Sequence, residues 1–137
     1  MFFRKPVKEV RVAIEADVLR TLHPNKLVTI IPAPGRGKAI EVISANVQTA
    51  TGNTALAFTD DFGLVAGGIG TSRAQLIMAA PVINSQFDQW ACMVPGDWHG
   101  SLIENGAINF GPLVGANLAP NADTDVIVDV MYRVVKG

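Results

Sequence analysis

The side chains best suited to nucleophilic catalysis in this 137-residue chain are its one cysteine, Cys92, and its two histidines, His23 and His99. Nucleophilic catalysis requires a nucleophile, a base and an orienting group in contact with one another. His23 precedes Pro24 in a turn-like segment, which predicts a solvent-exposed ring. A lone cysteine is more often a small buried apolar residue than a nucleophile. We therefore predict a protein that is not an enzyme and has no catalytic residues.

Two glycine-rich segments partly match phosphate-binding loops. Pro34–Lys38 contains a Gly-Lys pair, but it lacks the first glycine of a Walker loop and is followed by Ala39 instead of Ser or Thr. The segment Gly68–Gly70 lacks the third glycine of a dinucleotide-binding loop. We interpret Pro32–Gly37 as a tight turn, because proline fixes φ and glycine permits positive φ. No cofactor is predicted.

No metal site is predicted either. One cysteine and two widely separated histidines give no zinc-ligand spacing. Asp123 and Asp125 lie on one face of a predicted strand, but calcium needs six or more oxygen ligands and the EF-hand spacing is absent. We interpret these two residues as solvated acids at the start of a strand.

Two tryptophans near one predicted turn are the strongest candidates for a small-ligand site. Trp90 and Trp98 flank the turn Pro95-Gly96-Asp97. An aromatic ring offers a flat apolar platform, and a carboxylate accepts hydrogen bonds from hydroxyl groups. Trp90, Asp97 and Trp98 are therefore candidates for a carbohydrate-binding site. A role in the core or in a subunit interface is the favoured interpretation of the tryptophans.

The composition indicates one globular domain without a nucleic-acid or membrane partner. The chain is 49% hydrophobic and 17% charged, and its length suits a single domain. Its net charge of −1 argues against nucleic-acid binding, which needs a basic surplus. The longest apolar run, Leu76–Ala80, is far shorter than the roughly 20 residues of a membrane-spanning helix. We expect an N-terminal arm at residues 1–6 and one domain at residues 7–137.

The charges are unevenly distributed along the chain. Residues 1–38 contain eight basic and three acidic side chains, whereas the remainder contains three basic and nine acidic ones. Interleaved strands would balance this asymmetry on the folded surface, and this interpretation is favoured. The alternative is a basic N-terminal arm that docks on an acidic partner.

Apolar and polar residues alternate with a period of two over most of the chain, which predicts strands. We expect strands at 9–16, 27–31, 38–49, 56–61, 102–103, 108–110 and 126–135, and a strand or a helix at 74–80. Within 38–49, Ile40, Val42, Ser44 and Asn46 should share one face. Asn105-Gly106 predicts a hairpin turn, and the spacing of Phe87, Trp90 and Met93 is compatible with one helical turn. About eight strands with regularly spaced turns predict an all-β, two-sheet β-sandwich of the jelly-roll type.

Two segments carry a resemblance to a known family. Leu27–Val42, with the sequence LVTIIPAPGRGKAIEV, and Val130–Val135, with the sequence VMYRVV, resemble segments of small tailed-phage structural proteins. The family comprises jelly-roll capsid decoration, or cementing, proteins. The resemblance implies a virion protein that binds the outer surface of a capsid and cements neighbouring capsomers. A carbohydrate- or receptor-binding module on a phage particle is the alternative.

The implied partners are the major capsid protein and further copies of this chain, as a homodimer or a homotrimer. The predicted capsid contact lies at the N-terminus, where Phe2 and Phe3 precede the cations Arg4, Lys5 and Lys8. Such a segment can insert aromatic anchors into pockets while its cations meet an acidic rim. The resemblance supplies no active-site residues.

Overall fold

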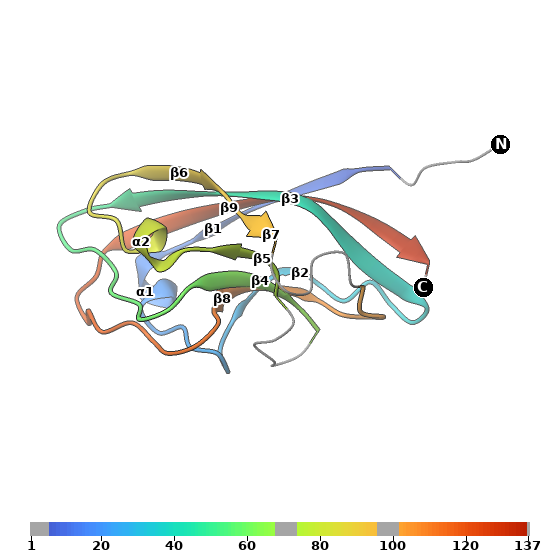
Figure 1. Cartoon of the computed structure of the whole chain (residues 1–137), viewed down its shortest axis with the longest axis horizontal. Helices are drawn as coiled ribbons and strands as arrows, with labels where there is room; N and C mark the ends of the chain where they lie inside the picture. The colour runs from blue at the N-terminus through green and yellow to red at the C-terminus, as the bar shows by residue number, and fades with distance from the viewer. Residues whose placement is uncertain (1–5, 68–73, 96–101, 137) are drawn as a thin grey trace.

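A computed structural model describes residues 6–67, 74–95 and 102–136, which form a β-sandwich of two antiparallel sheets (Figure 1). The four-stranded sheet has the order β1-β9-β3-β6, comprising Lys8–Ile14, Thr124–Lys136, Lys38–Thr51 and Gln89–Cys92. The five-stranded sheet has the order β2-β8-β4-β5-β7, comprising Val28–Ile31, Ile108–Pro112, Phe62–Ala66, Ala74–Met78 and Val94–Pro95. The two helices among the described residues, α1 (Ala16–Leu19) and α2 (Ala80–Ile83), are single turns.

The strand pairing is that of a jelly roll. Strand β1 pairs with β9, β2 with β8, β3 with β6, and β4 with β5. The pairs are nested: the first strand pairs with the last one, and each later pair lies inside the one before it in the sequence. This order results when a long antiparallel ribbon folds over into two sheets. The short strand β7 is an addition at the edge of the second sheet. The predicted all-β, jelly-roll-like sandwich is confirmed.

The core lies between the two sheets. Val47 and Val128 of the first sheet face Phe62, Leu64 and Phe110 of the second sheet. The rings of Phe62 and Phe110 are fully buried, and Phe62 contacts Phe58 edge to face at a centroid distance of 4.5 Å. Burying rings of this size supplies a large share of the apolar area that stabilises a small sandwich.

One expectation for β3 is wrong because the strand contains a β-bulge. Val42 pairs with Tyr132 and Ser44 pairs with Met131, so Ile43 has no partner on β9. The extra residue reverses the alternation. Val42 and Ala45 are both buried, whereas Ser44 is exposed. Ser44 and Asn46 therefore do not share the core face of Val42, as regular alternation predicted.

Several expectations for the middle of the chain are also wrong. The predicted strand at 56–61 forms only a bridge from Phe58 to Asn117, and the strand β4 begins after it at Phe62. The expectation of a strand or a helix at 74–80 is confirmed, since Ala74–Met78 form strand β5 and Ala80 begins α2, with Pro81 in the first helical turn. Trp90 lies on strand β6 and not on a helix. Segment 102–103 is not a strand, and β8 pairs with the distant strands β2 and β4 instead of a local hairpin partner.

Candidate functional site

The strand directions bring three lysines from distant parts of the sequence to one end of the sandwich. Because β9 is antiparallel to both β1 and β3, the end of β9 lies beside the starts of the other two strands. Lys38 pairs with Lys136 at the end of β9. Lys8 pairs with Tyr132, which precedes Lys136 on the same strand. We call this part of the molecule the basic end.

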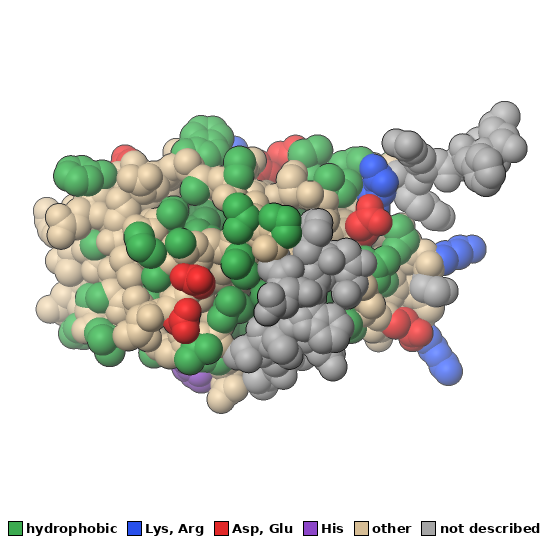
Figure 2. Space-filling view, viewed as in Figure 1, with side chains coloured by type: hydrophobic (Ala, Val, Ile, Leu, Met, Phe, Trp, Pro, Cys, Tyr) green, Lys and Arg blue, Asp and Glu red, His purple; other side chains and the backbone are tan. Residues whose placement is uncertain are grey.

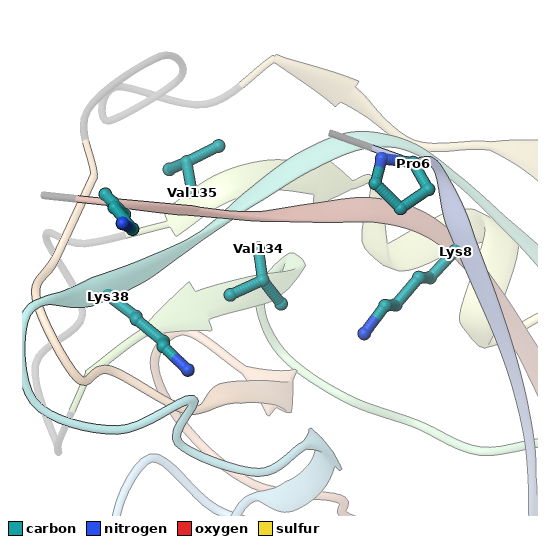
Figure 3. A pocket seen from close by; sticks show the side chains of 6 residues that line it. Pro6, Lys8, Lys38, Val134 and Val135 are labelled. Carbon is teal, nitrogen blue, oxygen red and sulfur yellow. The ribbon is translucent and has the colours of Figure 1, made fainter. Parts of the chain in front are cut away.

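A cavity of about 240 Å³ opens at the basic end. Lys8, Lys38 and Lys136 line it together with Pro6, Val134 and Val135. Figure 3 shows Lys8 and Lys38 reaching towards the opening from opposite sides of Val134. We call this cavity the lysine pocket.

The lysine pocket has cationic walls and an apolar floor. Its charged lining residues are all lysines, and none of the three forms an ion pair with a described residue. All three side chains are exposed, so solvent screens their mutual repulsion. An anionic group beside an apolar surface is the complementary ligand.

Strand β9 extends beyond its pairing with β1 at the lysine pocket. The ladder between the two strands stops at Lys8 and Tyr132, whereas β9 continues to Lys136. Pro6 stands just before the ladder, and proline has no N–H group to donate to it. The pocket therefore lies at a stretch of β9 edge that β1 does not cover.

The acidic side chains at the opposite end serve mainly to cap turns. Asp123 accepts hydrogen bonds from the backbone N–H groups of Asn53 and Thr54, at 2.8 and 2.7 Å. These bonds, that of Asn53 first, lower the pKa of Asp123 below its ordinary value. Asp125 likewise accepts a hydrogen bond from the N–H group of Ala16 at 2.8 Å. The predicted strand-start acids thus hold the loops at this end.

The cations of the basic end come from both the basic and the acidic part of the sequence, since Lys136 joins Lys8 and Lys38 there. Figure 2 shows Lys and Arg side chains gathered at the basic end, where β9 ends. Glu41, which pairs with Arg133 at 3.6 Å, is one carboxylate at the same end. Glu104, which forms a bridge with Ala39, is another. The favoured expectation of a charge-balanced surface stays a prediction.

The structure places only some of the predicted site residues. Lys8 lines the lysine pocket, whereas the predicted capsid-contact residues Phe2, Phe3, Arg4 and Lys5 lie outside the described residues. Trp90 lies exposed on β6, and the other two candidates for a carbohydrate site, Asp97 and Trp98, also lie outside them. Lys38 and Lys136 were not predicted as partners of Lys8. Only the strand register reveals that they converge.

The described part of the chain brings no catalytic or metal-binding group together. Cys92 is exposed on β6, and Nδ1 of His23 accepts a hydrogen bond from the Asn25 N–H group at 3.2 Å. His99 lies outside the described residues. No group of three potential metal ligands occurs within residues 6–67, 74–95 and 102–136. In the same ranges, no helix is long and apolar enough to cross a membrane.

Comparison with known proteins identifies a structural likeness. No family model matches the chain, and no curated protein matches it. A chain of the solved structure described as "Cyanophage Pam1 capsid asymmetric unit" has a similar fold, with a TM-score of 0.57 and 17% sequence identity. The match covers 97% of this chain and 88% of that chain. At this identity the likeness establishes a shared fold over nearly the whole length of this chain. It assigns no role to the residues of the lysine pocket.

Proposed function

We propose that this protein is a structural component of a phage virion that binds the outer surface of the assembled capsid and bridges neighbouring capsomers. The observation that carries the proposal is the fold shared, over 97% of the chain, with a chain from a phage capsid structure. The two sequence segments that resemble capsid decoration proteins support it independently. Many symmetric copies, each holding adjacent shell subunits, would raise the barrier to bursting.

The basic end is the proposed contact with the major capsid protein. The lysine pocket offers three cations around an apolar floor, and the edge of β9 beside it, Arg133–Lys136, does not pair with β1. A partner of complementary chemistry is an extended acidic segment, which can pair with the edge of β9 while its carboxylates meet the lysines. Residues 1–5, which contain two further cations, precede the pocket in sequence and would extend the same contact.

We further propose that the protein forms a homodimer or a homotrimer on the capsid. Several large apolar side chains are exposed among the described residues, including Phe87 at 75% and Leu118 at 70%. Exposed apolar patches commonly mark interfaces, and closed symmetric oligomers cover them. Analytical ultracentrifugation and counting of copies on the capsid test this proposal. A protein that is monomeric in both states contradicts it.

Co-sedimentation with expanded capsids tests the proposed contact. We expect the triple variant K8E/K38E/K136E to lose most of its capsid occupancy, because three attractions become three repulsions. Binding of the wild type should weaken as salt rises, since charges are screened over about 10 Å at 0.1 M ionic strength. Deletion of residues 1–6 should weaken binding and leave the domain folded.

Lys26→Glu is the matched control for charge reversal. Lys26 is an exposed lysine outside the lysine pocket, and its Nζ donates a hydrogen bond to Thr21 Oγ1. This variant should bind capsids as the wild type does. Equal occupancy of the triple variant and the wild type would move the contact away from the basic end. No binding of the wild type to any capsid state would refute the proposed function itself.

A further inference from the structure

The outer face of the four-stranded sheet carries two ordered rows of side chains that the proposed capsid contact does not use. Strand register places Ala13, Ile127, Gln48 and Trp90 in one row across the sheet. The adjacent row contains Arg11, Asp129, Asn46 and Cys92. Residues that alternate with these, such as Val47 and Val128, are buried in the core, so both rows point outward.

Trp90 stands at the edge of a groove along these rows. Its side chain is 73% exposed. A small hollow of about 20 Å³ is lined by Trp90, Arg11, Asn46, Gln48, Ile127 and Asp129. A larger one of about 380 Å³ shares Gln48 and Ile127 with it and continues towards Glu15 and Asp125. Three interstrand spacings of about 4.8 Å make each row roughly 14 Å long, so the groove suits an oligomeric ligand.

Several polar side chains of the groove have donors or acceptors without a hydrogen-bond partner among the described residues. Among the described residues, the side-chain amides of Asn46 and Gln48 have no hydrogen-bond partner, and each amide can both donate and accept. Oδ1 of Asp129 is covered and has no partner among the described residues. Arg11 and Trp90 are exposed side chains that line the same hollow, so they can move aside and admit a donor to this oxygen.

We propose that this groove binds a neutral oligosaccharide. The apolar C–H face of a sugar ring packs on an exposed indole, while its hydroxyl groups donate to carboxylates and exchange hydrogen bonds with amides. Three carboxylates, those of Glu15, Asp125 and Asp129, line the groove against the one guanidinium of Arg11. This balance disfavours sialylated or sulfated glycans and nucleic acids. The proposal concerns a face distinct from the lysine pocket and does not depend on capsid binding.

The test is titration of the full-length protein with maltohexaose, cellohexaose, laminarihexaose, chitohexaose and mannohexaose, with heparin as the acidic comparison. Isothermal titration calorimetry gives the affinity. Alkylation of Cys92 by iodoacetamide gives a second readout, because this exposed thiol ends one row of the groove. We expect at least one neutral oligosaccharide to bind with a Kd below about 1 mM and to slow the alkylation.

Trp90→Ala should weaken that binding at least about tenfold, or about 1.4 kcal/mol. Phe87→Ala is the matched control, since Phe87 is 75% exposed and does not line the groove. Asn46→Ala should also weaken binding, with the fold preserved as judged by circular dichroism. Absence of binding by all five neutral sugars, or equal effects of the two aromatic substitutions, overturns the proposal. A change of oligomeric state by Trp90→Ala without sugar binding identifies the face as a subunit interface instead.

Discussion

Two glycines that lie side by side in the five-stranded sheet give a quantitative test of its packing. Gly63 of β4 pairs with Gly111 of β8, and both are buried. The side chain of Leu113 lies over Gly63, and that of Leu27 lies over Gly111. Because glycine has no side chain, Gly63 and Gly111 leave space on this face of the sheet for the side chains of Leu113 and Leu27.

Gly63→Ala should destabilise the protein by about 1–2 kcal/mol. A Cβ atom at this position would lie 2.6 Å from Cδ2 of Leu113 and 3.3 Å from both Ala74 Cβ and the Leu76 carbonyl oxygen. Overpacking of this kind costs about 1–3 kcal/mol. Reduced freedom of the unfolded chain offsets about 0.4–1 kcal/mol. Gly111→Ala should cost less. At both glycines the closest atom is a terminal methyl group of a half-buried leucine, which can rotate away, but the next nearest atom to the added Cβ at Gly111 is 3.5 Å away, so no second close contact remains there.

Urea unfolding monitored by circular dichroism measures both effects, and a double-mutant cycle isolates the contact. In the background of Leu113→Ala, the colliding methyl group is absent, so Gly63→Ala should cost less than it does in the wild type. The backbone contact with Leu76 keeps that cost above zero. Equal costs in the two backgrounds, or a stabilising Gly63→Ala, would refute the packing argument.

Three further predictions concern the acidic end, the turn before β3 and the core. Asp123→Asn should lower stability at neutral pH; because folding lowers the pKa of this carboxylate, the difference from the wild type should shrink as the pH falls below 3.8, as urea unfolding at several pH values measures. Gly35→Ala should cost about 1–3 kcal/mol, because φ is +111° there, whereas exposed Arg36→Ala should leave the melting temperature nearly unchanged. Phe62→Ala should cost about 3–5 kcal/mol, since it empties a fully buried site; a loss below about 1 kcal/mol in thermal melting would contradict the assigned core.

Regular alternation made the long strands predictable. Residues 126–135 have an apolar or aromatic side chain at every second position, from Val126 to Val134, and form most of β9. Residues 38–49 form most of β3, although the bulge at Ile43 changes which residues face the core. A bulge cannot be recognised from the sequence of its own strand, because it is defined by pairing: two residues of one strand lie opposite one residue of the partner strand. The faces of β3 therefore required the register with β9.

The bounds of β4 and β6 were not predictable in this way. All five residues of β4, Phe62–Ala66, are buried, so no polar residue alternates with the apolar ones. Strand β6 has only four residues, and its pairing with β3 places Trp90 opposite Gln48. Strand β6 pairs with the distant strand β3, so no local hairpin signal marks it. Strand β4 pairs both with β5, the next strand in the sequence, and with the distant strand β8.

The candidate site also has features that the sequence predicted and features that required the tertiary structure. Local sequence patterns were enough to predict the sandwich class and the turn within Pro32–Gly37, and they singled out Lys8 as a candidate contact residue. The tertiary structure alone decided that Lys8, Lys38 and Lys136 line one pocket and that Trp90 shares a groove with Asp129. Local patterns record which residues are buried or turn the chain, because those properties act over a few neighbouring residues. The meeting of distant side chains depends on strand order and register, which antiparallel pairing across the whole chain sets.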